Sequence, residues 1–461
     1  MLLEKIGHWL QRNGKRIRIL QWNIILFYAI LIIVPAYLPL PSTQAHILKN
    51  LTLFAQFAFW GIWWPFVILS IVLFGRMWCG VLCPEGALTE IASSHGLGRP
   101  IPRWMRFGGW PFIAFGVTTI YGQMISVYQY PKPVLLILGG STLAAIIIGF
   151  IYGKSNRVWC KYLCPVNGVF ALLAKLAPFW YQSNQIQWKQ EPLETLTVNC
   201  PTLLPLRHMT SASGCHMCGK CSGYKNAIHL SPRSPNQEIV EQSLKKQNTW
   251  ESIFIIYGLL GIALGAFQWS VSHWLPLIKE YLATKLIDNE IMWPFDTNAP
   301  WWLFTNYPHQ QDIFSWLDGF LVIGYIVLFS ICMGSFVFLL LYTTTRIIGK
   351  FQIARFNHLA QTLIPLAGCG VFIGLLANTI TLLRNENIIF TWITTGKFIL
   401  LLLSTFWSGY LAWKVIQKYS ISIQSKITAI ISMSIIYIAI NGTWVFILLI
   451  WSVKPDIRVL L

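Results

Sequence analysis

The chain has 461 residues, of which 55% are hydrophobic and only 11% are charged, and its mean hydropathy is +0.57. Soluble globular domains carry about 25% charged residues, so this composition excludes an ordinary soluble protein and predicts an all-α polytopic membrane protein. The formal net charge of +18 could indicate nucleic-acid binding, but here the basic residues flank apolar runs. Basic flanks determine membrane topology and attract anionic lipid head groups, so we expect no nucleic-acid partner.

About nine apolar runs are long enough to cross a bilayer, which takes about 20 residues of helix. The first run follows a basic segment, which predicts a cytoplasmic N-terminus and, after nine crossings, a periplasmic C-terminus. That first run is long enough to span the membrane and to be retained rather than cleaved as a signal peptide. The expected spans cover residues 20–40, 51–75, 110–130, 134–152, 253–271, 313–342, 359–383, 388–413 and 427–451.

Composition divides the chain into three expected domains. Residues 1–153 form a four-span membrane region, residues 154–249 a polar stretch, and residues 250–461 a five-span membrane region. The polar stretch predicts a small cytoplasmic domain. Its beginning, 166–181, is apolar, and we expect a helix there that lies along the membrane interface.

One phrase occurs twice, as RMWCGVLCP at 76–84 and as RVWCKYLCP at 157–165, each time after an apolar run. The spacing is compatible with each cysteine pair holding two corners of one shared cluster. The alternatives are reduced structural thiols, or thiols that handle metal or redox chemistry without a stable cluster. Disulfides are not expected on the cytoplasmic side, where the thiol pool is reducing. The two copies contribute Cys79, Cys83, Cys160 and Cys164.

Both copies of the phrase begin with an arginine, Arg76 and Arg157. A guanidinium beside a four-thiolate cluster would offset its negative charge and raise its reduction potential. The alternative is that both arginines only anchor the chain at the inner membrane face. The sequence leaves both interpretations open.

A third cysteine group follows in the polar stretch. Cys-x-x-Cys-x-x-Cys is the opening of the bacterial ferredoxin pattern, in which thiolates hold an iron-sulfur cluster. The usual fourth cysteine is missing, and the Cys-Pro pair 15 residues upstream is the natural replacement. Zinc is the alternative occupant, and His208 and His216 are alternative ligands. The expected set is Cys200, Cys215, Cys218 and Cys221.

Two further cysteines, Cys332 and Cys369, fall inside expected spans, where we expect them to act as small packing residues. The chain contains no Cys-x-x-Cys-His motif for covalent haem attachment. Its histidines fall at span ends or in loops, whereas a bis-histidine haem needs them within facing spans. Haem is therefore not an expected cofactor.

The repeated Cys-x-x-x-Cys-Pro phrase, followed by the third cysteine group, resembles the membrane polyferredoxin family, which includes NapH and MauN, the CcoG/RdxA/FixG proteins and the C-terminal half of NosR. The resemblance covers about 20–242. It implies a 4Fe-4S protein of the bacterial inner membrane that passes electrons between the cytoplasmic side, the quinone pool and periplasmic redox or metal-handling partners. By position, it implies the four cysteines of the repeats as paired motif residues and Cys215, Cys218 and Cys221 as cluster ligands.

Two departures from the family pattern matter. NapH-like proteins commonly carry two complete ferredoxin motifs, whereas this chain has one incomplete motif, which reduces the expected number of clusters in the polar stretch to one. The five C-terminal spans also lie outside the family core.

We therefore expect an inner-membrane electron carrier or oxidoreductase subunit with one or two 4Fe-4S clusters and a quinone as a further candidate cofactor. It would take electrons from a cytoplasmic donor toward quinone or a periplasmic redox or metal-handling protein, with other membrane subunits as further partners. One alternative is a redox accessory subunit of an iron or copper uptake or assembly system. Another is a transporter-like subunit with redox-sensing clusters, which predicts ionisable residues such as Lys397 deep in the C-terminal spans.

Overall fold

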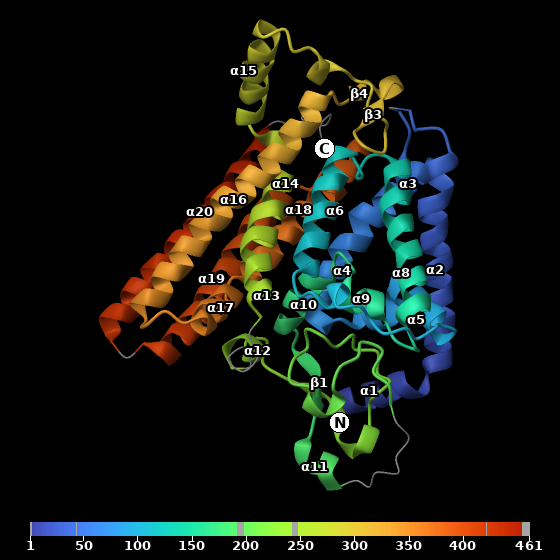
Figure 1. Ribbon diagram of the computed structural model, residues 1–461, viewed down its shortest axis with the longest axis vertical. Helices are drawn as coiled ribbons and strands as arrows, with labels where there is room; N and C mark the ends of the chain where they lie inside the picture. Colours follow the sequence, from blue (N-terminus) through green and yellow to red (C-terminus); the bar gives the residue numbers. More distant parts are fainter. Residues whose placement is uncertain (1, 43, 191–197, 242–247, 421, 454–461) are drawn as a thin grey trace. The chain divides into compact units, whose positions relative to one another are not determined.

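The computed structural model describes residues 2–42, 44–190, 198–241, 248–420 and 422–453 (Figure 1). These residues are mostly helical, which confirms the expected all-α class. In the described ranges, strands occur only as two antiparallel pairs. Strand β1 (Phe179–Ser183) pairs with β2 (Ile228–Pro232), and β3 (Asn306–Tyr307) pairs with β4 (Asp312–Ile313).

Eight helices of the described part are long and apolar enough to cross a membrane. A chain with this many apolar helices is a multi-pass membrane protein, as its composition predicts. The helices cover Gly14–Tyr37, Leu51–Phe74, Pro131–Tyr152, Thr249–Val271, Trp316–Ile347, Ile364–Asn385, Ile393–Tyr419 and Ile423–Leu449.

The ninth expected span, 110–130, forms a shorter helix, α6, over Trp110–Met124. Its 15 residues extend about 22 Å at 1.5 Å per residue, less than the roughly 30 Å of a hydrocarbon core. The helix ends because the chain turns at Ser126, whose φ of 48° lies in the left-handed region. Hydrophobicity over 110–130 is continuous, so the sequence pattern does not reveal this turn.

Five of the long helices are continuous, and the other three contain π-helical turns. The continuous helices are α2 (Gly14–Tyr37), α16 (Trp316–Ile347), α18 (Ile364–Asn385), α19 (Ile393–Tyr419) and α20 (Ile423–Val453). The interrupted ones are α3 (Leu51–Gln56), η2 (Phe57–Trp63) and α4 (Trp64–Phe74); α7 (Pro131–Val134), η5 (Leu135–Gly139) and α8 (Gly140–Tyr152); and α13 (Thr249–Ile253), η10 (Phe254–Ala263), α14 (Leu264–Gln268) and η11 (Trp269–Val271).

The chain forms two compact units, each built from three segments. We describe each unit by itself. The first unit comprises Met1–Val34, Trp63–Ala114 and Leu138–Glu251, and the second comprises Pro35–Ile62, Phe115–Ile137 and Ser252–Leu461.

In the first unit, the helix that follows the first repeat, α5 (Pro84–Ser94), packs closely against α8 (Figure 1). A Cβ at Gly149 would lie 2.6 Å from the carbonyl oxygen of Thr89, and a Cβ at Gly153 would lie 2.4 Å from the Cβ of Ser93. Small residues therefore allow the two backbones to approach, as in other membrane helix pairs. Because α8 leads into the second repeat, this contact brings the two repeats together.

The N-terminal helix α1 (Leu2–Arg12) lies against β2 in the same unit (Figure 1). A Cβ at Gly7 would lie 2.7 Å from the hydroxyl oxygen of Ser222, and a Cβ at Gly219 would lie 2.4 Å from the Cβ of Leu10. The basic N-terminal segment, expected only to set topology, is therefore also a packing element that covers the loop around Cys221.

The helix expected over 166–181 is confirmed only in part: a short apolar helix covers Asn167–Leu176, and the end of the segment forms a strand. The segment begins with a short helix, α10 (Asn167–Leu173), and a 3₁₀ turn, η6 (Ala174–Leu176), and then becomes strand β1. Most of it is buried inside the first unit rather than lying on a surface. The Arg233 side chain donates to the carbonyl oxygens of Ala174, Lys175 and Ala177 at 2.8 to 3.0 Å, so a distant residue ends the helix.

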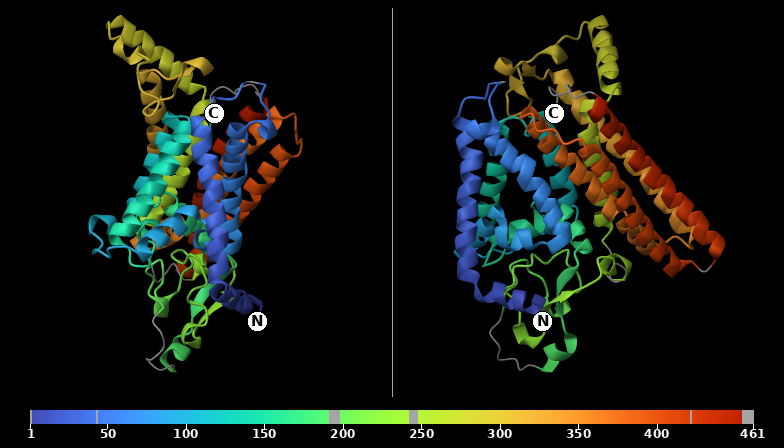
Figure 2. Two further views of the ribbon diagram at one scale, coloured as in Figure 1. Left: turned by 90° about the vertical axis from the view of Figure 1, so that its right-hand side faces the viewer. Right: turned by 180° about the vertical axis from the view of Figure 1, so that it is seen from behind.

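The second unit is a helix bundle in which α16 and α20 lie side by side (Figure 2). Its short helix α17 (Ile353–Gln361) carries buried polar side chains: Asn357 accepts from the hydroxyl of Ser252 at 2.8 Å, and Nδ1 of His358 lies 2.8 Å from the hydroxyl of Tyr419. Lys397 in α19 is only 8% exposed. An ionisable residue buried within a membrane helix is costly and is a candidate functional residue.

Candidate iron-sulfur site

The two repeats form the same local structure. In the first, the backbone N–H of Cys83 donates to the carbonyl oxygen of Trp78 at 2.9 Å; in the second, the N–H of Cys164 donates to that of Trp159 at 3.0 Å. Both bonds join residues five apart, which is the spacing of a π turn. Each turn presents two cysteines four residues apart. The elements are η3 (Trp78–Leu82) followed by α5, and α9 (Val158–Tyr162).

The four repeat cysteines, here called the paired set, are Cys79, Cys83, Cys160 and Cys164. Burial raises the pKa of the Cys83 thiol, and negative charge on Cys79 and Cys160 raises it further. Burial likewise raises the pKa of Cys164, as do charges on Cys160, Cys83 and Cys79. Because such effects act between close neighbours, these shifts indicate that the four thiols share one buried site.

A buried carboxyl accompanies the paired set. Glu85 follows Cys83 by two residues and accepts a hydrogen bond from the indole N–H of Trp159 at 3.2 Å. Burial raises the pKa of Glu85, although this bond lowers it in part. The Trp159 indole of the second repeat thus binds the carboxyl group of Glu85, which directly follows the first repeat.

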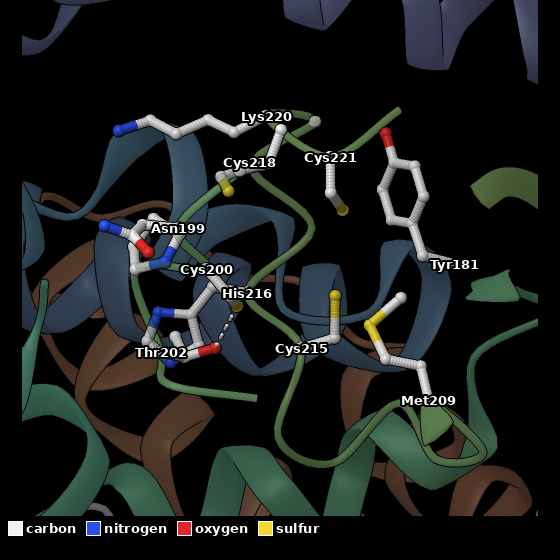
Figure 3. Close-up of a pocket in the computed structure, with 13 residues that line it drawn as sticks. Tyr181, Asn199, Cys200, Thr202, Met209, Cys215, His216, Cys218, Lys220 and Cys221 are labelled. Carbon is white, nitrogen blue, oxygen red and sulfur yellow. Dashed lines mark hydrogen bonds between the residues drawn. The ribbon is translucent and has the colours of Figure 1, made fainter. Parts of the chain in front are cut away.

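The second set, here called the CxxCxxC set, consists of Cys200, Cys215, Cys218 and Cys221. All four line one cavity. Figure 3 shows them arranged around this space together with Tyr181. The chain therefore brings the upstream cysteine to the same cavity as the three clustered ones, and four thiolates are the number that one iron-sulfur cluster needs.

Burial raises the pKa of the Cys215 thiol to about 12, and charges on Cys218 and Cys200 contribute. Thiols with raised pKa values hold their protons at neutral pH, and binding of a metal must displace these protons. The loop that carries them turns tightly at Met217 and Gly219, with φ values of 54° and 78°. Glycine adopts the left-handed region without steric penalty, so Gly219 suits the turn between Cys218 and Cys221.

The spacing of the cysteine sulfurs does not match a single zinc ion. With Zn–S bonds of about 2.3 Å, tetrahedral zinc holds its sulfur ligands about 3.8 Å apart. Among the residues that the structure describes, no three cysteine sulfurs lie within 4.8 Å of one another. A multi-iron cluster separates its thiolates more widely than one ion does.

The two histidines considered as alternative ligands differ. His216 lines the cavity and is 4% exposed, and its Nδ1 has no hydrogen-bond partner in the described ranges. Burial, with the charges of Arg76 and Arg157, lowers the pKa of His216, which keeps the imidazole neutral. His208 is exposed and does not line the cavity.

Both repeat arginines are buried, at 3% and 2% exposure, so neither anchors the chain at a solvated membrane face. Arg76 donates to the side-chain oxygen of Asn167 at 2.7 Å and to the carbonyl oxygen of Ser213 at 2.6 Å. The first residue lies just after the second repeat and the other just before Cys215. Arg76 therefore joins the first repeat to both other cysteine segments.

Arg157 makes the complementary contacts. Its Nε donates to the Glu90 carboxylate at 2.7 Å, and its two terminal nitrogens donate to the carbonyl oxygens of Cys79 and Gly80. Its backbone N–H donates to the carbonyl oxygen of Pro201 at 2.6 Å. The second repeat is thus fixed to the first repeat and to the residue after Cys200.

Glu90 is 5% exposed and accepts from three basic side chains. Arg18 lies 3.1 Å from its carboxylate, and Lys220 and Arg157 also contact it. Burial alone would raise the pKa of Glu90, but the charges of Arg157 and Lys220 outweigh burial and hold it at about 2. A buried, ionised carboxylate therefore connects α2, α5, the second repeat and the CxxCxxC loop.

A second buried ion pair holds the other side of that loop. Arg233 contacts the carboxylate of Glu238, which also accepts from the backbone N–H of Ala212 at 3.0 Å. Both charged side chains are nearly inaccessible, at 1% and 3% exposure. The turn before Cys215 is therefore fixed before any cofactor binds.

The two cysteine sets meet at Gly80. A Cβ there would lie 2.0 Å from the carbonyl oxygen of His216 and 2.9 Å from the backbone nitrogen of Cys218. Backbone therefore packs directly on backbone between the paired set and the CxxCxxC set. Only glycine permits this approach.

Sequence reasoning missed Glu90, Arg233, Glu238, Asn167 and Gly80. The chain has only 16 acidic residues, so an acidic side chain within an apolar context such as 84–94 is a signal for a buried ionic partner. Gly80 also stands out, because the equivalent position of the second repeat holds Lys161. No local signal links Arg233 to the helix that it ends.

Replacing Arg157 by Leu removes the buried partner of Glu90. Breaking a buried ion pair costs about 3–5 kcal/mol, so we expect a lower midpoint of thermal unfolding for the detergent-solubilised protein. Lys154→Ala, at an exposed basic residue three positions upstream, is the matched control and should leave the midpoint unchanged. Equal midpoints for Arg157→Leu and wild type would contradict a structural role for this network.

Comparison with known proteins agrees with this geometry. Residues 56–104 and 136–183 match the family described as "4Fe-4S binding domain", and each match contains one repeat. The chain is 22% identical over 250 residues to "Putative electron transport protein YccM" of Escherichia coli strain K12, which covers 48% of this chain and 68% of that protein. No solved structure matches significantly. Both repeats therefore lie in segments that are similar to a 4Fe-4S binding domain, which supports iron-sulfur binding by this chain.

Proposed function

We propose that this protein is an inner-membrane electron carrier with two 4Fe-4S clusters, one on each cysteine set. It takes electrons from a cytoplasmic donor and passes them toward a quinone or a periplasmic redox or metal-handling partner. The observation that carries the proposal is the backbone contact at Gly80, which brings two buried sets of four cysteines together in one unit. The 4Fe-4S domain match and the similarity to an electron transport protein support it.

Each set suits an iron-sulfur cluster in number, burial and charge. Four thiols are the usual ligand set, and the surrounding protein excludes water from most of them. Arg157 lowers the pKa values of Cys160 and Cys218 against the opposing effect of burial. One guanidinium therefore stabilises thiolate charge in both sets. A 4Fe-4S cluster, when bound, supplies reversible one-electron transfer at such a site.

The order of the two sets follows from their surroundings. The CxxCxxC set lies in the polar segment, where Lys220 is half-exposed beside it. The paired set follows the ends of two membrane spans, Leu51–Phe74 and Pro131–Tyr152. We therefore assign the CxxCxxC set to the donor side and the paired set to the membrane side.

The acceptor must be reached across the membrane if it is periplasmic. Both cysteine sets belong to the first unit, so the chain must cross the membrane an even number of times between the repeats. We therefore assign α6, despite its 15 residues, as a crossing in a locally thinner bilayer. By the predicted topology both sets then lie on the cytoplasmic side, whereas the hydrocarbon core is about 30 Å thick. Neither set alone bridges that distance. A diffusible quinone satisfies the requirement because it carries electrons within the bilayer.

The buried Lys397 supports a second function, a transporter-like subunit whose clusters sense redox state. An intramembrane ionisable residue marks a functional site by default, and this one lies in α19 at 8% exposure. The two functions differ in what Lys397→Met changes. In a transporter it abolishes solute flux into proteoliposomes, whereas in an electron carrier it leaves quinone-dependent cluster oxidation intact.

Iron and acid-labile sulfide in the anaerobically purified protein test the number of clusters. We expect about eight iron atoms per chain in the wild type, since each 4Fe-4S cluster holds four. The double variants Cys215→Ala/Cys218→Ala and Cys79→Ala/Cys83→Ala should each retain about four, because each destroys one ligand set. Cys332→Ala, at an exposed cysteine outside both sets, is the control.

Three results would contradict the proposal. About four iron atoms in the wild type, with no loss of iron in the Cys79→Ala/Cys83→Ala variant, would mean that the repeat cysteines hold no cluster and have a structural or thiol role. Zinc without sulfide would exclude electron transfer by these sites. Normal reduction by dithionite and oxidation by quinone in Cys215→Ala/Cys218→Ala would exclude that set from the electron path.

Gly80→Ala tests the contact between the sets. The new Cβ has no room beside His216, so the CxxCxxC loop must move, and we expect the EPR signal of the reduced protein to lose the magnetic interaction between two clusters. Gly140→Ala is the matched control, because a Cβ there meets nothing within 4 Å. An unchanged interaction signal in Gly80→Ala would show that the clusters do not meet at this point.

A further inference from the structure

Outside both cysteine sets, the structure gathers one more group of metal-ligating side chains. Ligand atoms of Glu4, His8 and His229 lie within 4.8 Å of one another. Glu4 and His8 are four residues apart on α1 and therefore share one helix face. His229 comes from the middle of β2. The sequence shows no motif here, because the two elements are more than 200 residues apart.

The hydrogen bond of His229 fixes its tautomer and leaves Nδ1 as the nitrogen that can bind a metal ion. Its Nε2 lies 2.9 Å from the carbonyl oxygen of Asn226. A carbonyl can only accept, so Nε2 carries the proton and the neutral ring presents a lone pair at Nδ1. A backbone carbonyl in this position is the usual outer partner of a metal-bound histidine.

The contact between His229 and Glu4 calls for a cation. Nδ1 of His229 is buried and lies 3.3 Å from the Glu4 carboxylate, yet it makes no hydrogen bond among the described residues. A second proton on the ring makes this contact an ion pair, and a metal ion between the two atoms satisfies both the Nδ1 lone pair and the carboxylate oxygen in the same way. Tetrahedral zinc bonds of about 2.0–2.2 Å place neighbouring N and O ligands about 3.3–3.5 Å apart, which matches the observed separation.

The third ligand, His8, is positioned by the CxxCxxC loop. A Cβ at Gly223 would lie 2.6 Å from Cε1 of His8, so the imidazole packs on the bare backbone of this glycine, whose φ is 74°. Gly223 follows Cys221 by two residues. The same helix inserts Leu3 against the apolar cluster that contains Cys215 and Cys221.

We propose that Glu4, His8 and His229 bind one divalent transition-metal ion that fastens α1 across the CxxCxxC loop. Two imidazoles and one carboxylate form the donor set of zinc and non-haem iron(II) sites that keep an open position for water. The site is distinct from both cysteine sets, since it uses none of their sulfurs. Docking of α1 against the loop then depends on the bound metal ion. The metal ion takes no part in the proposed electron transfer.

Equilibrium dialysis against Zn²⁺ tests the site. The full-length protein carries a non-histidine affinity tag, retains its iron and is washed with chelator before zinc is measured by mass spectrometry. We expect one zinc per wild-type chain. Loss of an outer partner weakens metal sites about 10–100-fold, so His8→Ala, His229→Ala and Glu4→Gln should weaken Zn²⁺ binding by at least that factor. His95→Ala, at an exposed histidine of the same unit, should bind like the wild type.

A second measurement distinguishes loss of a metal ion that holds α1 in place from misfolding of the variant protein. Trypsin cleaves after Lys5 and Arg12 only when α1 detaches, so Zn²⁺ should slow this cleavage in the wild type and in His95→Ala but not in the three ligand variants. Iron content must stay unchanged in those variants, which shows that the rest of the unit is folded. Equal zinc affinity in His229→Ala and wild type, or zinc-independent cleavage of the wild type, would overturn the proposal.

Discussion

The ion pair between Arg157 and Glu90 is the interaction on which the first unit depends. Moving two charges out of water is expensive, and a buried pair is tolerated only when hydrogen bonds satisfy the remaining donors and acceptors. Here hydrogen bonds satisfy both groups. The guanidinium donates to two carbonyl oxygens of the first repeat, and the carboxylate accepts from Arg18 and Lys220. Arg157 and Glu90 cannot separate without leaving an unpaired charge in the buried interior, whereas the outer partners Arg18 and Lys220 are partly exposed to solvent.

This network also breaks the symmetry of the repeats. The position equivalent to Glu90 in the second repeat is Ala171, and the position equivalent to Gly80 is Lys161. Only the first repeat therefore offers both a carboxylate for Lys220 and a bare backbone for His216. Two similar turns can share one cluster, but the CxxCxxC loop has a single place to dock.

Much of the site could be predicted from local sequence, because cysteine spacing is a local property. The two repeats and the clustered cysteines were visible without any structure, as were most of the spans. The role of Arg157 was not, since a basic residue after an apolar run looks the same whether it contacts lipid head groups or a carboxylate 67 residues away. The early end of α6 and the strand that follows η6 depend likewise on backbone turns and on distant partners such as Arg233.

The packing of α1 has a consequence for biogenesis. This helix lies more than 200 residues upstream of the surface that it covers, around Gly219 and Gly223, so that surface is made much later than the helix. It must therefore wait undocked while the spans between are inserted. During that interval α1 does not cover the loop that carries Cys218 and Cys221, and docking of this helix closes over the loop afterwards. The order of synthesis thus sets when the CxxCxxC loop is covered, because one short helix and its docking surface lie far apart in the sequence.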